Sequence, residues 1–337
     1  MTASVHALGP AAPPSLGPIV ALTAEGMNAV NAVILERMQS KVAMIPELAG
    51  HLIAGGGKRM RPMLTLASAA LLDYPGVRHH KLAAAVEFIH TATLLHDDVV
   101  DGSAIRRGKR AANLIWGNPA SVLVGDFLFS RAFELMVEDG SLKVLRILSH
   151  ASAVIAEGEV DQLTAQRRIE TSEDHYLGII NAKTAELFAA ACRVAPVVAE
   201  AGEAAEEALE SFGRNLGIAF QLVDDAIDYA SDTETMGKGR GDDFRDGKVT
   251  LPVILAFARG SADERAFWAA AIGGERNDDG DLAKATRLIR SSGALDDTME
   301  RARLYARRAV DALAPFPAGR AKAALTQSAE FAVARSY

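Results

Sequence analysis

The sequence of 337 residues contains a single cysteine, Cys192, which lies in an apolar stretch with helical periodicity. One cysteine excludes an internal disulfide framework and a zinc site built from several cysteines, and it favours a reducing compartment. Net positive charge is also missing, because 43 acidic residues outnumber 36 basic ones and give a formal charge of −7. Such a chain is not expected to bind nucleic acid through bulk positive charge. Any anion-binding site must therefore be a local basic cluster.

Long apolar runs are absent as well. The best candidate for a membrane span, residues 185–199, is interrupted by Glu186, Arg193 and Pro196. The first basic side chain apart from histidine is Arg37, so no early positive charge indicates a targeting segment, and we expect a cytoplasmic protein. With 49% hydrophobic and 23% charged residues, the chain is not expected to be disordered as a whole, because it can bury a sizeable core.

Apolar residues recur at intervals of three and four from about residue 23 onward, as in Val30, Val33 and Ile34. No convincing alternating pattern of a strand separates these runs, and Ala, Leu and Glu dominate them. We therefore predict an all-α fold, a single large helical bundle around a deep central cavity. Residues 1–22 contain four prolines and are predicted to form a disordered N-terminal arm, whereas residues 23–337 form the bundle domain.

Two of the helical runs carry the most informative pattern, three aspartates at positions i, i+1 and i+4 directly after apolar residues. On a helix, i and i+4 lie on one face, so each run presents a pair of carboxylates on one stripe. Repulsion and desolvation disfavour such pairs unless a cation lies between them, and oxygen ligands alone favour Mg²⁺. One cluster alone is often a solvated helix end, but two of identical spacing favour clusters that face each other in one cavity. The clusters are Asp97, Asp98 and Asp101, and Asp224, Asp225 and Asp228.

Short basic clusters beside predicted helix breakers supply groups that could bind phosphate. After the glycines at 55–57, Lys58 and Arg61 are one helical step apart, and Arg106 and Arg107 follow the first aspartate cluster. The glycine run is not a Walker loop, because the lysine is followed by arginine. Aspartates for a metal and separate basic groups together predict a substrate that carries a diphosphate, with hydrocarbon against the aliphatic walls. Three later basic residues belong to the same group: Lys183, Lys238 and Lys248.

These motifs, taken together and in order, resemble those of the trans-polyprenyl diphosphate synthases, and within them the long-chain octaprenyl, solanesyl and decaprenyl branch. The resemblance covers essentially the whole chain after the arm. It implies the isoprenoid synthase fold, usually as a homodimer. The motifs that carry it are GGGKRMRP (55–62), EFIHTATLLHDDVVD (87–101), RRGKRAAN (106–113), SVLVGDFLFSRAF (121–133), IAEGEVDQL (155–163), KTAELF (183–188), FQLVDDAIDY (220–229) and GKGRGDDFRDGKVTLP (237–252).

The resemblance implies a role for each matching residue. The metal ligands would be Asp97, Asp98, Asp101, Asp224 and Asp228, which would hold three Mg²⁺ ions with substrate bound. The catalytic residues would also include Asp225, Lys183 and Lys238. The allylic diphosphate would be bound by Arg106, Lys183, Thr184, Gln221, Lys238 and Lys248. Isopentenyl diphosphate would be bound by Gly57, Lys58, Arg61, His90 and Arg107.

The implied reaction condenses an allylic diphosphate, expected to be farnesyl diphosphate, with successive isopentenyl diphosphates. Ala92 and Thr93 lie about one turn before Asp97, at positions where large aromatic residues stop chain growth in the family. Both are small here, which predicts a product of about eight to ten isoprene units, suited to a quinone side chain. Ile147 or Leu148 is expected at the floor of the path. A product this long also suggests a peripheral membrane contact for its release.

Three other interpretations stay open. A short-chain farnesyl or geranylgeranyl diphosphate synthase is disfavoured by the small residues at positions 92 and 93. A terpene cyclase would share the first aspartate cluster, but neither the second cluster nor the GGGKRMRP segment. A non-catalytic subunit of a hetero-oligomeric synthase would be expected to have lost motif residues, and no motif position is substituted here.

Overall fold

The computed structural model describes residues 14–54, 57–230, 241–274 and 278–335, and most of these residues are helical. The only strands within these ranges are β1 (Ile105–Arg106) and β2 (Lys109–Arg110), which form one short hairpin. The all-α prediction is therefore confirmed. The helices up to the middle of the chain are α1 (Gly17–Arg37), α2 (Met44–Ala54), α3 (Met60–Leu71), α4 (Arg78–Val100), α5 (Ala112–Trp116), α6 (Asn118–Asp139) and α7 (Leu142–Ala165). The later ones are α8 (Glu173–Ile180), the π-helix η1 (Asn181–Ala185), α9 (Glu186–Val198), α10 (Glu203–Ala230), α11 (Asp242–Arg245), α12 (Leu251–Arg259), α13 (Ala262–Ile272), α14 (Asp279–Ser291), α15 (Ala294–Ala312) and α16 (Arg320–Ala334).

The boundary predicted for the N-terminal arm is wrong. Helix α1 begins at Gly17, so residues 17–22 are helical, whereas residues 1–13 lie outside the described part of the chain. Pro18 suits a first helical turn, where no backbone N–H is required, and the fully buried Ile19 anchors the helix to the core. By length and composition α1 could also cross a membrane, a test that core helices pass as well. In this structure it packs against α3, α4 and α16.

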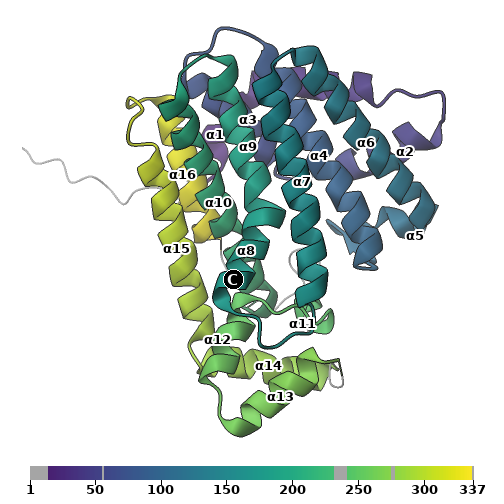
Figure 1. Cartoon of the computed structure of the whole chain (residues 1–337), viewed down its shortest axis with the longest axis vertical. Helices are drawn as coiled ribbons and strands as arrows, with labels where there is room; N and C mark the ends of the chain where they lie inside the picture. Colours follow the sequence, from purple (N-terminus) through teal and green to yellow (C-terminus); the bar gives the residue numbers. More distant parts are fainter. Residues whose placement is uncertain (1–13, 55–56, 231–240, 275–277, 336–337) are drawn as a thin grey trace, which may run out of the picture.

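Three apolar clusters hold the helices together. The first lies mainly between α2, α4, α6 and α7, the second between α12, α13, α14 and α15, and the third between α1, α3 and α16. Helix α9 contributes to the first and third clusters, and α10 contributes to the second and third. These two helices therefore lie at the centre of the bundle and connect its parts (Figure 1).

Helices α9 and α10 pack with their backbones unusually close. A Cβ atom at Gly213 of α10 would lie 2.3 Å from the carbonyl oxygen of Phe188, and one at Gly217 would lie 2.6 Å from the Cα of Ala185. Only glycine allows this approach, because any side chain would force the helices apart. The segment before α9 is the π-helix η1, whose wider turns are frequent at functional sites. The close packing brings η1 next to the aspartates of α10.

Helix α4 and the hairpin after it bring the first aspartate cluster and two arginines together. The residues from Leu82 to Ile89 are all buried, so α4 is enclosed on every side over this stretch. The helix ends at Val100, and the hairpin follows with positive φ at Arg107 and Gly108. Positive φ at both central residues is typical of a two-residue type I′ turn. The tight turn folds the strands back toward the end of α4.

Candidate active site

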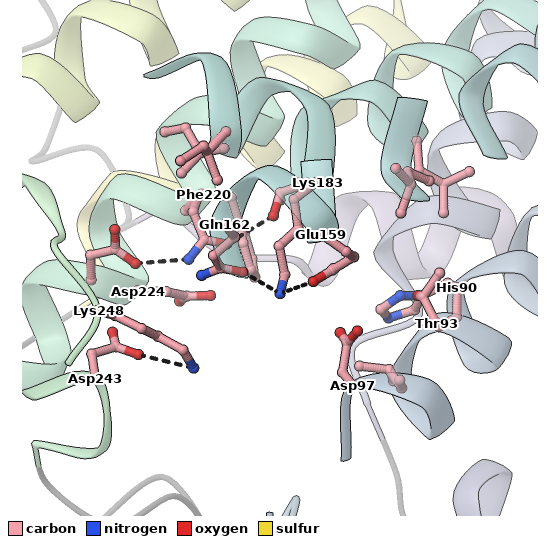
Figure 2. A pocket seen from close by; sticks show the side chains of 18 of the residues that line it. His90, Thr93, Asp97, Glu159, Gln162, Lys183, Phe220, Asp224, Asp243 and Lys248 are labelled. Atoms are coloured by element: carbon pink, nitrogen blue, oxygen red, sulfur yellow. Dashed lines mark hydrogen bonds and ion pairs between the residues drawn. The ribbon is translucent and has the colours of Figure 1, made fainter. Parts of the chain in front are cut away.

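A cavity of about 530 Å³ opens between α4 and α10. Figure 2 shows Asp97 of α4 on one side of it and Asp224 of α10 on the opposite side. The two aspartate clusters therefore face each other, as their equal spacing predicts. Aliphatic side chains make up much of the remaining wall, among them Leu94, Ile155, Ile179, Leu187 and Ile227.

In the first cluster, only Asp97 and Asp101 face the cavity. Asp98 is completely buried and accepts hydrogen bonds from the guanidinium of Arg106, with the Arg106 Nε at 2.8 Å. The prediction that Asp98 is a metal ligand is therefore wrong for this structure, because residue i+1 points about 100° away from the stripe shared by i and i+4. Asp98 instead holds Arg106 at the rim of the cavity.

All three aspartates of the second cluster line the cavity. Asp225 accepts hydrogen bonds from the Tyr176 hydroxyl and, at 2.8 Å, from the side-chain amide of Gln221. Burial and the neighbouring carboxylate of Asp243 together raise the pKa of Asp225 to about 7. Asp228 accepts a hydrogen bond of 3.3 Å from the backbone N–H of Asp243. Asp224 and Asp228, at i and i+4 on α10, are thus the pair that shares one cavity-facing stripe of the helix.

Lys183 projects from η1 into the cavity, as predicted, although it lies within a helical run and not beside a helix breaker. Its ammonium group donates to the Glu159 carboxylate and to the Gln162 side-chain oxygen, both at 2.7 Å (Figure 2). Burial raises the pKa of Glu159 to about 7, and the nearby Asp97 carboxylate also raises it. Lys183 is therefore held between the two walls by groups that a diphosphate could replace.

Lys248 connects the two sides of the cavity. Its ammonium group lies 3.2 Å from a carboxylate oxygen of Asp101 and 3.0 Å from one of Asp246. Burial alone would lower the pKa of Lys248, but Asp243, Asp101 and Asp246 raise it above its ordinary value, so the side chain stays charged. The other lysine predicted from this segment, Lys238, lies outside the described residues.

The residues predicted to bind isopentenyl diphosphate also meet at the cavity. Arg61 lies on the ring of Phe188, and its Nη1 is 3.2 Å from Nε2 of His90. Burial lowers the pKa of His90 well below its ordinary value, and Arg61 lowers it further, so the neutral imidazole can accept a hydrogen bond from the guanidinium. A Cβ at Gly57 would lie 2.6 Å from Cζ of Arg107, so a side chain at this position would displace the guanidinium from the loop.

The remaining predictions concern the allylic site and the path of the tail. The hydroxyl of Thr184 donates to the side-chain oxygen of Gln221 at 3.0 Å, and both residues line the cavity. Thr93 also lines the cavity, but Ala92 is fully buried in the adjoining core. Ala92 does not line this cavity, so its place along the path of the tail stays a prediction. Leu148 is fully buried two turns before the cavity-lining Ile155, so it does not border the cavity. Its expected place at the floor of the path stays a prediction.

Several residues that line or border the cavity were not predicted from the sequence. Glu159 and Gln162 lie within the segment 155–163, which is one of the motifs that resemble the family. The resemblance assigned no role to either side chain. Glu87 is buried and lies 3.0 Å from Arg59, but a glutamate inside an apolar helical run gives no sign of its partner. Arg335 reaches the cavity from the far end of the chain, and no local pattern could have indicated it.

The carboxylates around the cavity fit a shared divalent cation. Among the described residues, no three His, Cys, Asp or Glu side chains form a ready metal cage. Each wall instead contributes a pair, Asp97 with Asp101 and Asp224 with Asp228. Mg²⁺ suits such an incomplete oxygen set, because it keeps several waters and is usually shared between carboxylates and substrate phosphates.

A family profile described as polyprenyl synthetase matches residues 42–289 of this sequence. The chain belongs to the polyprenyl synthetase family. An octaprenyl diphosphate synthase from Haemophilus influenzae is 44% identical over 325 residues, which cover 96% of this chain and 98% of that protein. The predicted family and the predicted class of enzyme, a prenyltransferase, are thereby confirmed.

Two solved structures of the family have the same fold. A polyprenyl synthase from Caulobacter crescentus, complexed with calcium and isoprenyl diphosphate, has a TM-score of 0.94 and 56% identity, covering 97% of this chain and 99% of its own. A decaprenyl diphosphate synthase from Rhodobacter capsulatus has a TM-score of 0.91 and 50% identity, covering 95% of this chain and 98% of its own. The isoprenoid synthase fold is therefore established for this member of the family.

The raised pKa of Glu159 predicts that, without ligands, the folded protein becomes less stable as the pH rises and this carboxyl ionises. A carboxyl whose pKa is raised by folding binds its proton more tightly when folded, so stability falls as pH rises from about 4.5 to about 7. Glu159→Gln cannot ionise, and its stability relative to the unchanged protein should therefore improve across this window by roughly 2 kcal/mol. Urea unfolding at pH 4.5 and pH 8 measures the change.

The matched control for this experiment is Glu157→Gln, an exposed residue of the same helix α7. It should leave the difference between the two pH values as it is in the unchanged protein. Equal pH dependence in Glu159→Gln and the unchanged protein would contradict the assignment.

Proposed function

We propose that this chain is a long-chain trans-polyprenyl diphosphate synthase, which adds isopentenyl diphosphate units repeatedly to an allylic diphosphate, expected to be farnesyl diphosphate. The observation that carries the proposal is a single cavity with carboxylate pairs on opposite walls and basic residues grouped beside them. Its relatives named octaprenyl and decaprenyl diphosphate synthases support a long product. We infer a product of about eight to ten isoprene units.

We assign the two diphosphates to different groups of residues in the cavity. Arg61 and His90, with Lys58 and Arg107, form one basic group around the loop before α3, and we assign isopentenyl diphosphate to it. The allylic diphosphate is assigned to the groups between the aspartate walls, which are Arg106, Lys183, Thr184, Gln221 and Lys248, together with the predicted Lys238. The two substrates then meet with their reacting carbons between the groups.

Mg²⁺, of which we propose three ions with substrate bound, would be held by Asp97, Asp101, Asp224 and Asp228. When bound, the metal supplies positive charge to the diphosphate as it departs. Arg106 and Lys183 add charge-assisted hydrogen bonds at the same place, and these strengthen as negative charge grows on the leaving group.

The reaction breaks the bond between the allylic carbon and the diphosphate oxygen, which leaves an allylic cation. The double bond of isopentenyl diphosphate attacks this cation, and a new carbon–carbon bond forms. A proton then leaves the adjacent carbon, and we assign its acceptance to the released diphosphate. Ile155, Leu187 and the other aliphatic residues exclude water, which would otherwise capture the cation.

We further propose that the enzyme is a homodimer that pairs through the outer face of α6. Leu123 and Val137 are 66% and 64% exposed, and Phe133 is exposed on the same stripe of the helix. Helix α6 lies away from α10 and α15, on the side of the bundle that carries α2 and α5 (Figure 1). Aliphatic and aromatic side chains left exposed together in this way favour a protein interface.

The proposed location is the cytoplasm, with peripheral membrane contact during product release. The acidic chain offers no bulk attraction to nucleic acid, which we do not expect as a partner. A product with a long hydrocarbon tail has low solubility in water and must pass to an apolar phase. Transfer at a membrane surface meets this requirement.

Activity of the protein alone tests the proposed function directly. With Mg²⁺, farnesyl diphosphate and labelled isopentenyl diphosphate, the unchanged protein should make long-chain products, sized by thin-layer chromatography after removal of the phosphates. Asp97→Asn and Asp224→Asn should each lower kcat at least about a hundredfold, because each removes a carboxylate that would hold the cation whose charge stabilises the leaving group. Asp263→Asn, on the distant α13, is the control. Failure to incorporate label from farnesyl diphosphate and from a shorter allylic diphosphate would support the non-catalytic subunit. Labelled products that stop at fifteen carbons from the shorter primer, or at twenty from farnesyl diphosphate, would support the short-chain enzyme.

The position of Thr93 predicts control of product length. Its side chain lines the cavity one turn before Asp97, so Thr93→Tyr should place a ring across the path and shift products to a few isoprene units. Thr93→Val keeps the size of the side chain and should leave product length unchanged. A full-length product from Thr93→Tyr, measured by the same chromatography, would mean that the tail takes another route.

The proposed dimer predicts a mass of twice 35.7 kDa in sedimentation equilibrium. Replacing both Leu123 and Val137 by glutamate should weaken association at least about tenfold, because charges would have to be buried in the interface. Leu304→Glu, at an exposed position of α15, is the matched control and should remain dimeric. A monomeric unchanged protein would overturn the proposed assembly.

A further inference from the structure

Arg335, directly after α16, is held firmly inside the cavity although it lies near the end of the chain. Its guanidinium donates from Nη1 to the Asp224 carboxylate at 2.7 Å and from Nη2 to the carbonyl oxygen of Phe220 at 3.1 Å. Nε donates to the carbonyl oxygen of Ala332 at 3.1 Å, and the guanidinium lies 4.1 Å from the centre of the Phe220 ring. Its side chain is only 7% exposed. In this cation-free structure the guanidinium is therefore buried and paired with one carboxylate, unlike that of a surface arginine.

The partner of this arginine is a carboxylate that the proposed function assigns to Mg²⁺. Asp224 lines the cavity on the wall opposite Asp97. A carboxylate oxygen that already accepts a charge-assisted hydrogen bond offers less negative charge to a metal, and two cations beside one carboxylate repel each other. Arg335 and a divalent cation therefore compete for Asp224.

A second binding position for the guanidinium lies close by. Lys58 is on the same side of the cavity, with its ammonium group 6.0 Å from the centre of the Phe220 ring and 5.3 Å from that of Phe331. Arg335 and Lys58 thus share the Phe220 ring. A diphosphate bound by Lys58 would lie near the guanidinium, and phosphate is a strong acceptor for the fork of arginine.

We propose that Arg335 acts as a counter-ion of Asp224 in the cation-free protein and, when a divalent cation binds there, turns to the diphosphate held by Lys58. This inference rests on the proposed function, because it needs both a cation at Asp224 and a diphosphate at Lys58. Helix α16 need not move, because it packs against α1, α3, α10 and α15, and Arg335 itself has extended backbone beyond the last helical turn. A change of side-chain rotamer is sufficient.

The proposed exchange has opposite effects on its two partners. Removing the guanidinium frees Asp224, so cation affinity should rise. The same change removes a donor from the second diphosphate, so affinity for isopentenyl diphosphate should fall. If the arginine had only a structural role, its removal would weaken the affinity for both the cation and isopentenyl diphosphate, or for neither. Binding measurements on one variant can therefore distinguish the exchange from a general loss of structure.

The experiment measures thermal unfolding of the full chain against Mg²⁺ concentration, without substrates. Arg335→Gln should reach half of its stabilisation at an Mg²⁺ concentration about tenfold lower than the unchanged protein, because a hydrogen bond between charged groups no longer competes. Arg335→Lys keeps the charge without the fork and should lie between the two. Arg320→Gln removes an equal charge from the exposed start of α16 and should match the unchanged protein.

Steady-state kinetics provide the second measurement. Arg335→Gln should raise the KM for isopentenyl diphosphate about tenfold, with a smaller effect on the KM for the allylic substrate. Equal Mg²⁺ midpoints in Arg335→Gln and the unchanged protein would overturn the exchange while leaving the proposed function intact. If Mg²⁺ fails to stabilise the unchanged protein even with inorganic pyrophosphate present, the proposed function itself is overturned, and the exchange with it.

Discussion

Repulsion between carboxylates in a partly dry cavity is the constraint on which the rest of this structure depends. Asp97 and Asp101 face Asp224 and Asp228 across one space, and Glu159 lies between these walls. Water screens such charges poorly inside a cavity lined by aliphatic residues. The chain balances them with its own cations, each placed against a particular carboxylate: Lys183 with Glu159, Lys248 with Asp101, and Arg335 with Asp224.

This balance dictates features of the fold far from the carboxylates. The glycines of α10 let its backbone touch α9, and this contact places η1 with its lysine beside the aspartates of α10. The tight hairpin after α4 returns Arg106 to the completely buried Asp98. The close packing and the tight turn therefore serve the same purpose, which is to place cations from different segments within reach of one cavity.

Local patterns in the sequence were sufficient to predict the helical fold and to place most of the aspartates at the cavity, because spacing along a helix decides which side chains share a face. They were not sufficient to tell which face meets the cavity. Asp98 was expected to face the cavity, and it is completely buried instead. Arg335 and Glu87 pair with residues distant in sequence, so their roles depend on tertiary packing that no local spacing contains.

The arrangement of charges also bears on how ligands enter. A divalent cation that arrives alone must compete with Lys248 and Arg335 for the carboxylates it needs. A diphosphate that arrives alone meets the same carboxylates as like charges. A cation and a diphosphate that arrive together relieve both problems, because the metal takes the carboxylates while the displaced lysines and arginines turn to the phosphate oxygens. Under the proposed function, the cation-free site would therefore favour the metal–diphosphate complex over either component, with the protein's own cations holding both positions until that complex binds.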